Sequence, residues 1–285
     1  MSWKVKAKHA LLAAEELCGI EWARDKVWAA RGILTAPVLV FHRVTDDIPG
    51  DGITVSTRRF REIVRNLKDH YNPIPLARLL DYLAKGETWP AKTVVVTFDD
   101  GYLDNHAHAA PILAEYGVSA TFFVTTDAIG SDRVMPWDAQ LPRRLPWMDW
   151  HHVRELRTRG FEIGSHTLTH PDLGKLPPSD ACVEIAGSKE KLEQELGSAV
   201  TSFAYPFGGK GNITEENREL VKRAGYSCCC SAYGGFVRLA TDRFNIHRLG
   251  VNSWYSDTRE IDFEIRIAAP WRWGKIAADG SDAAS

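Results

Sequence analysis

The sequence lacks several features that would each indicate a particular class of protein. Lysine and arginine (35) nearly balance aspartate and glutamate (37), which leaves a formal charge of −2. Because no excess or run of basic residues is present, we expect no nucleic-acid partner. No apolar run reaches the length of a membrane-spanning helix. The Gly-x-Ser-x-Gly motif of serine hydrolases is also missing, which disfavours a serine nucleophile.

Cysteine is scarce, and its spacing disfavours a thiolate zinc site. The chain has five cysteines and no Cys-x-x-Cys pair. Cys228, Cys229 and Cys230 are consecutive, and their side chains would alternate in direction along a strand. We therefore predict reduced thiols in a buried strand, which favours a cytoplasmic protein.

The N-terminal region has helical periodicity. Apolar residues between Trp3 and Arg31 recur near the helical period, with an interruption at Gly19. Met1–Ala14 has basic residues but no continuous apolar core or cleavage site, so the pattern does not predict a signal peptide. We expect a helix packed on the outside of the domain. The alternative is an interfacial helix that contacts a partner or the inner face of the membrane.

Strands and helices alternate over most of the remaining chain. The β-branched run Val94–Val96 suits a strand buried on both faces. A helical pattern over Leu103–Tyr116 and a β-rich run at Ala120–Thr125 follow it. This alternation predicts an α/β fold with a mostly parallel sheet. We predict an N-terminal helical extension at 1–35, a single large domain at 36–270 and a disordered tail at 271–285.

Several predicted strands end in residues that suit one chemical site. Asp99 and Asp100 follow the valine run, His42 follows the apolar stretch before it, and His166 and His170 follow a later strand. The carboxyl ends of parallel strands meet at one edge of a sheet. Two imidazoles and one carboxylate can hold a divalent metal, while a second carboxylate acts as a base. The alternative is an Asp-Gly turn with structural histidines.

The motifs at these strand ends are similar to those of a known family. Thr97–Tyr102 and His166–His170 match the first two motifs of the polysaccharide deacetylases, the NodB-homology or carbohydrate esterase family 4 enzymes, and Tyr205–Gly208 resembles the third. The resemblance covers about residues 36–265. It implies a distorted, incomplete (β/α) barrel, to which this chain adds an N-terminal helix.

The resemblance also implies roles for individual residues. Asp99 would be the general base, and the backbone N–H of Phe207 would stabilise the oxyanion. The divalent metal, zinc by the usual interpretation, would be held by Asp100, His166 and His170. Substrate contacts are predicted at Tyr102, Tyr205, Pro206 and Trp254.

The sequence departs from the family pattern at two points. Ala204 occupies the position of an arginine that orients the base, and we hypothesise that Arg248 reaches the base instead. The usual late motif with the acid histidine does not match around His247. The stretch before His42 resembles the permuted exopolysaccharide (poly-N-acetylglucosamine type) deacetylases, so we favour His42 over His247 as the acid.

These observations predict a metal-dependent hydrolase that removes N-acetyl groups from amino sugars. The expected substrate is a polysaccharide or a lipid-linked or nucleotide-linked glycan precursor. One alternative is a deformylase or amidase that acts on another N-acyl sugar. Another is a glycan-binding family member without catalytic activity.

Overall fold

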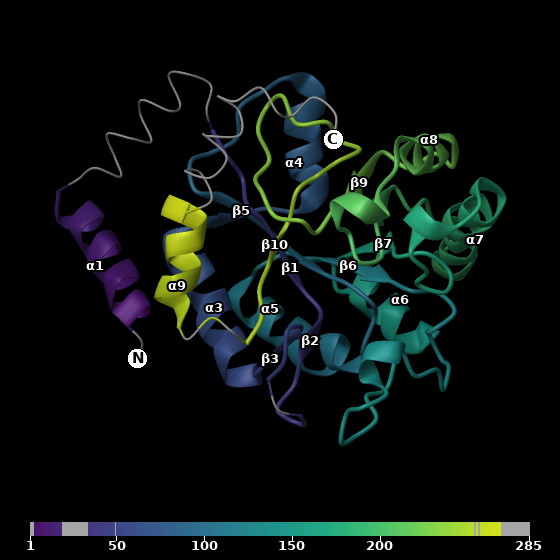
Figure 1. Ribbon diagram of the computed structural model, residues 1–285, viewed down its shortest axis with the longest axis horizontal. Helices are drawn as coiled ribbons and strands as arrows, with labels where there is room; N and C mark the ends of the chain where they lie inside the picture. The colour runs from purple at the N-terminus through teal and green to yellow at the C-terminus, as the bar shows by residue number, and fades with distance from the viewer. Residues whose placement is uncertain (1–2, 19–33, 49, 254, 256, 269–285) are drawn as a thin grey trace.

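The computed structural model describes residues 3–18, 34–48, 50–253, 255 and 257–268. Parallel strands occupy the centre of the molecule and helices surround them (Figure 1). The main sheet runs in the order β10-β1-β5-β6-β7-β8-β9, and every pair along this path is parallel. Its strands are β1 (Val38–Phe41), β5 (Thr93–Phe98), β6 (Thr121–Val124), β7 (Glu162–Ser165), β8 (Ser202–Ala204), β9 (Cys228–Cys230) and β10 (Leu249–Gly250).

The sheet curves into the incomplete barrel that the motifs implied. Ile246 forms a parallel bridge with Cys230 of β9, and Leu249 pairs with Leu39 of β1 a few residues later. This segment therefore connects the two edges of the sheet. β4 (Asn72–Pro73) pairs in parallel with the first residues of β5. β2 (Arg43–Val44) pairs in parallel with β3 (Thr54–Val55) beside the barrel.

Alternation along β5 explains its apolar sequence. All six residues of the strand are buried. Val94, Val96 and Phe98 pack in the outer core beneath the helices, whereas Val95 packs in a second core with residues of β1, β6 and β9. Because side chains alternate between faces, Asp99 continues the row of Val95 and Thr97 toward the barrel interior.

Helices cover the outer face of the sheet. Ser56 caps the start of α3, since its hydroxyl accepts a hydrogen bond from the Arg59 N–H. Gly117 ends α5 in the left-handed conformation. The helices of the domain are α3 (Thr57–His70), α4 (Leu76–Lys85), α5 (Ala110–Tyr116), α6 (Trp150–Thr158), α7 (Pro178–Leu196), α8 (Glu215–Arg223) and α9 (Thr258–Phe263).

The helix expected over Leu103–Tyr116 is present, and it contains a π-helical turn, η1 (Asn105–Ala109), before α5. Pro111 explains this turn, because its ring removes an N–H and crowds the carbonyl four residues earlier. β8 ends at Ala204, where the sheet pairing stops.

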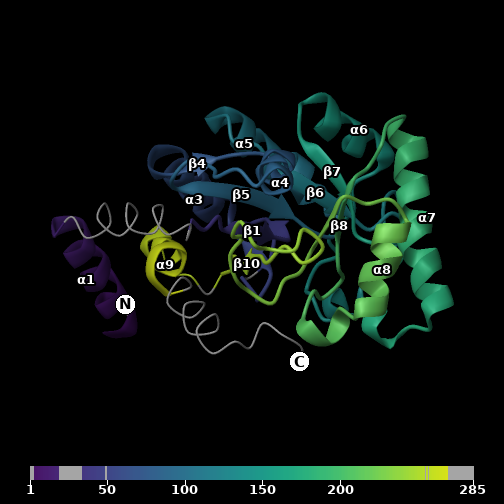
Figure 2. The same cartoon turned by 90° about the horizontal axis from the view of Figure 1, so that it is seen from above.

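The predicted N-terminal helix is present as α1 (Trp3–Leu17) and packs on α9. Figure 2 shows the two side by side at one end of the molecule, with α7 and α8 at the other. Val5 and Leu12 are buried, and Lys8 Nζ lies 3.2 Å from Glu260 Oε1. None of the described helices has the length and apolarity needed to cross a membrane. The boundaries at 35 and 270 stay predictions, and the predicted tail, 271–285, lies outside the described residues.

Candidate metal centre and active site

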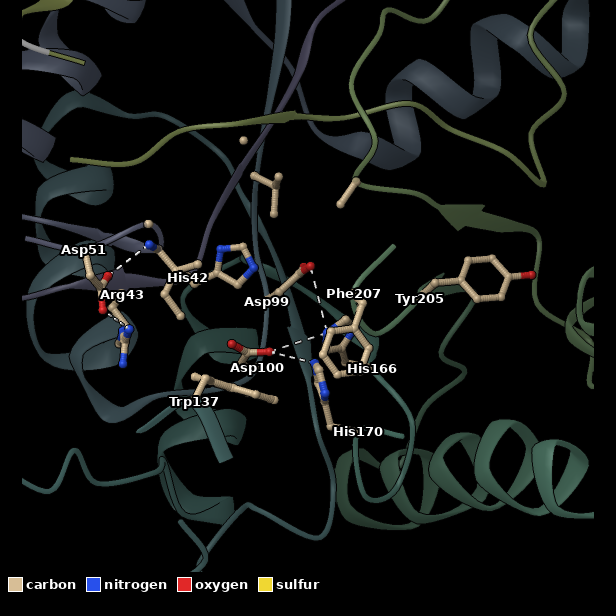
Figure 3. Close-up of a pocket in the computed structure, with 15 residues that line it drawn as sticks. His42, Arg43, Asp51, Asp99, Asp100, Trp137, His166, His170, Tyr205 and Phe207 are labelled. Carbon is tan, nitrogen blue, oxygen red and sulfur yellow. Dashed lines mark hydrogen bonds and ion pairs between the residues drawn. The ribbon is translucent and has the colours of Figure 1, made fainter. Parts of the chain in front are cut away.

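Asp100, His166 and His170 converge at the carboxyl ends of β5 and β7 (Figure 3). Asp100 Oδ1 lies 3.4 Å from Nε2 of each histidine. The Asp100 and His170 backbones have positive φ angles of 77° and 63°, which non-glycine residues rarely adopt. Such strain persists where surrounding structure holds it, and here it accompanies the convergence of the three side chains.

The three groups fit a divalent metal ion. Their ligand atoms lie within 4.8 Å of one another, and no hydrogen bond reaches the buried Asp100 Oδ1. His166 Nδ1 lies 2.8 Å from the Ala204 carbonyl oxygen, which only accepts. Nδ1 therefore carries the proton, and the lone pair of Nε2 faces Asp100. A buried acceptor without a donor, beside available imidazole nitrogens, is the donor set that a cation would satisfy.

The pKa values of these groups reflect strong mutual attraction. Burial alone would raise the pKa of Asp100, but the imidazoles of His166 and His170 hold it well below its usual value. Burial would lower the pKa of His166, and the carboxylates of Asp99 and Asp100 outweigh that effect and raise it. The negative charge that causes this shift also favours a bound cation.

The structure places Arg248 against Asp99, as we hypothesised. Its NH1 and NH2 atoms donate to Oδ1 and Oδ2 of Asp99, each at 2.7 Å. The guanidinium also donates to the Ser231 carbonyl and the Thr97 hydroxyl, and the side chain is 0% exposed. Burial would raise the pKa of Asp99, but Arg248 outweighs it and lowers that pKa. Asp99 therefore stays ionised, as a base requires.

Of the two candidate acids, His42 lines the cavity beside Asp99 and Asp100. Its backbone carbonyl accepts a hydrogen bond from the Asn105 amide at 2.7 Å, which fixes the residue between β1 and β2. Burial lowers its pKa, against the opposing effect of Asp100 and Asp99. His247 is not among the lining residues and stacks edge-on against Tyr233. The geometry thus favours His42, while its role in the reaction stays a prediction.

The cavity above the metal ligands has a volume of about 510 Å³. Trp137 and Phe207 form aromatic contacts with His170, with ring centroids 4.7 and 5.0 Å away. Phe207 is 55% exposed and has a positive φ of 61°. The described residues that line the cavity are Val40, His42, Arg43, Asp51, Gly52, Ile53, Asp99, Asp100, Trp137, His166, His170, Tyr205, Phe207, Ala232 and Gly250.

The predicted substrate contacts need correction. Tyr102 is fully buried outside this lining, where its ring stacks on Trp147 and its hydroxyl donates to Asp138. Pro206 is buried and also absent from the lining. Tyr205 touches the cavity, but its hydroxyl points away from the metal ligands and contacts Cys229 Sγ (Figure 3). Trp254 lies outside the described residues.

Sequence reasoning missed a polar network beside the cavity. Arg43 NH1 donates to Asp138 at 2.5 Å, and NH2 donates to Asp51 at 2.6 Å. Trp137 Nε1 donates to the Tyr102 hydroxyl, which connects Trp137 to the same network. The only signals were the position of Arg43 after His42 and the two aperiodic loops that hold the acids.

A parallel half-barrel with an Asp-His-His cluster at its strand ends defines the class of protein, an α/β protein with a candidate metal site. A model of the family "Polysaccharide deacetylase" matches residues 86–229, about half of the chain. The chain belongs to this family.

Two curated relatives illustrate the similarity. The Bacillus subtilis protein YxkH, named for the same family, is 26% identical over 217 residues, which are 76% of this chain and 71% of that protein. The poly-β-1,6-N-acetyl-D-glucosamine N-deacetylase of Escherichia coli K12 is 29% identical over 151 residues. That match covers 50% of this chain and 22% of the enzyme, so this chain spans only a part of it.

Solved structures share the fold. IcaB from Ammonifex degensii superimposes with a TM-score of 0.68 at 25% identity, over 82% of this chain and 97% of that one. The Streptococcus pyogenes deacetylase PplD superimposes with a TM-score of 0.70 at 22% identity, over 80% of this chain and 96% of that one. These neighbours confirm the incomplete barrel.

Proposed function

We propose that this protein is a zinc-dependent hydrolase that removes N-acetyl groups from amino sugars of a glycan or glycan precursor. One observation carries the proposal: Asp99, which Arg248 holds from behind, lines the same cavity as the Asp100–His166–His170 cluster. Two imidazoles and a carboxylate suit zinc and leave coordination positions open. The name of the Escherichia coli relative supports an N-acetylglucosamine polymer as the substrate class.

The arrangement assigns each residue a task in amide hydrolysis. Asp100, His166 and His170 would hold a divalent metal, and when bound it would supply a Lewis acid for the acetyl carbonyl and for water. Asp99, kept ionised by Arg248, accepts a proton from the attacking water. The Phe207 N–H would donate to the oxyanion.

His42 acts on the leaving group, the amine of the scissile C–N bond. As the C–N bond breaks, a proton from the imidazolium of His42 goes to the departing amine, which leaves acetate and the free amino sugar. Asp99 then returns its proton to solvent, and His42 takes one up. Because burial lowers the pKa of His42 below 6.5, we expect the rate to fall as the pH rises and His42 loses its proton.

The first experiment is acetate release from N-acetylglucosamine oligomers by the purified protein with zinc, cobalt or a chelator. We expect metal-dependent release that disappears in Asp99→Asn, while the metal content of the variant equals that of wild type. Bound metal without release would move the search to lipid-linked sugars or other acyl groups, such as formyl. Neither metal nor release would favour a glycan-binding protein without catalytic activity.

The acid is tested by comparing His42→Ala with His247→Ala. General acid catalysis contributes about 10²–10⁴-fold to a rate, so kcat should fall by about 10²-fold or more in His42→Ala. His247→Ala should retain kcat near that of wild type, because His247 is not among the lining residues. The reverse pattern would transfer the role to His247.

We also propose that α1 contacts the inner face of a membrane in the cytoplasm. Trp3 and Leu17 are 74% and 87% exposed, and Lys4 and Lys6 are exposed on the same helix. This combination suits an interface with anionic lipid, and the free cysteines suit a reducing compartment. Trp3→Ser should reduce co-sedimentation with anionic vesicles. Val183→Ser, at another exposed apolar residue, is the matched control.

A further inference from the structure

Asp51 is held in place at one side of the cavity. Arg43 donates to its Oδ2, and the backbone N–H of Ile53 donates to its Oδ1 at 3.0 Å. The Ser253 hydroxyl donates to the backbone carbonyl of Asp51. Two loops and one strand therefore fix this carboxylate, yet its side chain remains 36% exposed and lines the cavity. The exposed part of this carboxylate faces the cavity, where it can accept a hydrogen bond from a ligand.

The charges around Asp51 do not cancel. Arg43 is fully buried and serves two carboxylates, Asp51 and Asp138. One guanidinium and two carboxylates leave one negative charge. Among the described residues that line the cavity, Arg43 is the sole lysine or arginine. Hydrogen bonds and Arg43 outweigh the effect of burial and lower the pKa of Asp51, so the charge persists at neutral pH.

Asp51 also lies away from the metal ligands. In Figure 3, Asp51 and Arg43 are on one side of Asp99 and Asp100, and His166 and His170 are on the other. The network through Asp138 and Tyr102 links Arg43 to Trp137, which lies beside His170. When the acetyl group of one sugar reaches the metal ligands, the Asp51 side of the cavity would therefore be open to the next sugar of the glycan.

We propose that Asp51 recognises a protonated amine on that neighbouring sugar, so that the cavity prefers a glycan that already carries a free amino group. The inference rests on the proposed deacetylase function and names its preferred substrate. A sugar hydroxyl could also donate to Asp51, but an ammonium forms a charge-assisted and therefore stronger hydrogen bond. Deacetylation would then favour further deacetylation at adjacent sugars.

The test compares two trisaccharides that the enzyme cannot deacetylate, one of glucosamine and one of glucose with the same linkage. They differ only in carrying amines or hydroxyls at the second carbon. Dissociation constants are measured by calorimetry on the zinc-loaded protein at about pH 6.5, where such amines are protonated. Asp51→Asn removes the charge. Asp47→Asn is the matched control, since Asp47 lies in the same loop, pairs with Arg143 and does not line the cavity.

We expect wild type to bind the glucosamine trisaccharide about 5-fold more tightly than the glucose trisaccharide, as a half-exposed ion pair allows. Asp51→Asn should reduce this ratio to about 1, and Asp47→Asn should preserve it. In wild type the ratio should also shrink as salt screens the pair, a measurement that does not depend on the folding of a variant.

Equal binding of the two sugars, a ratio that survives in Asp51→Asn, or a ratio insensitive to salt would each overturn the inference. Acetate release decides the proposed function separately. A protein that releases acetate without an amine preference refutes the inference alone. A protein that shows the preference through Asp51 but releases no acetate refutes the deacetylase function alone.

Discussion

Asp99 at the carboxyl end of β5 is buried, Asp104 in the helical turn that follows is partly buried, and their pKa values shift in opposite directions. Arg248 overcomes the effect of burial on Asp99 and lowers its pKa. Asp104 precedes η1 and accepts hydrogen bonds from the Val44 N–H and the Asn105 amide, yet burial raises its pKa to about 6. Hydrogen bonds from neutral donors therefore do not replace a bidentate counter-charge here.

At the α1–α9 contact, two acids share one positively charged partner, which is intermediate between the pairing of Asp99 and that of Asp104. Glu260 and Glu264 are both buried, and Lys8 Nζ lies 3.2 and 3.6 Å from their carboxylates. One partly exposed lysine thus serves two acids, whereas Arg248 is fully buried and serves Asp99 through both of its terminal nitrogens. The site has the more rigid arrangement, as a positioned base requires.

Replacing Arg248 by methionine should have the largest effect, because it gives Asp99 the environment of Asp104. Removing one partner of a buried pair costs about 3–5 kcal/mol in the free energy of unfolding. The loss of a positioned, ionised base should lower kcat/KM about 10²-fold at neutral pH. Both are measured on the zinc-loaded protein, by urea unfolding and by acetate release.

The pH dependence provides the sharper readout. In wild type the pKa of Asp99 is depressed, so its favourable contribution is present above the usual value of 3.8 and is lost as the pH falls through the folded pKa. In Arg248→Met that pKa rises, so the acid limb of kcat/KM should move to higher pH. Arg248→Lys keeps the charge and should shift the limb less. An unmoved limb in Arg248→Met would mean that Arg248 does not control the base.

A smaller effect is expected at the α1–α9 contact. Lys8→Met leaves two buried carboxylates without their ammonium and should lower the free energy of unfolding by about 1–2 kcal/mol, between the values for exposed and buried pairs. Acetate release should not change. Lys6→Met is the control, because Lys6 is exposed on the same helix. Equal stability of the two variants would show that the ion pairs of Lys8 add nothing.

The parts of the site that could be predicted come directly after buried strands. Asp99, Asp100, His166 and His170 follow β5 and β7, and parallel pairing brings such ends to one edge. The contact between Arg248 and Asp99 was expected because Ala204 occupies the position where the family has an arginine. Adjacent residues point to opposite faces of an extended chain, which accounts for the different surroundings of His247 and Arg248.

The residues that could not be predicted depend on irregular segments. Asp51 lies in a loop and Asp138 ends a short 3-10 helix (Pro136–Asp138), and neither segment has a periodic sequence that would place its acid beside Arg43. Tyr102 follows the turn at Gly101, which directs its ring to Trp147 instead of the cavity. The orientation of Tyr205 depends on where β8 ends, and its hydroxyl meets Cys229 on the neighbouring strand.

The effect expected at Asp104 has the opposite sign, a gain in stability. Its folded pKa of about 6 exceeds the usual 3.8, so ionising Asp104 costs stability as the pH rises between these values. Asp104→Asn removes that charge and keeps an oxygen that can accept from the Val44 N–H. We expect the variant to be more stable than wild type by about 1–3 kcal/mol at pH 7, with the difference disappearing near pH 4.

Urea unfolding of both proteins between pH 4 and pH 7 tests this prediction. A variant that is less stable than wild type at pH 7 would mean that Asp104 has a counter-charge equivalent to Arg248, and the contrast with Asp99 would fail. A gain in stability would instead show that the fold tolerates a partly buried acid that lacks a bidentate counter-charge. Since Asn105 also binds the His42 carbonyl, kcat of Asp104→Asn would then reveal whether that charge contributes to placing the acid.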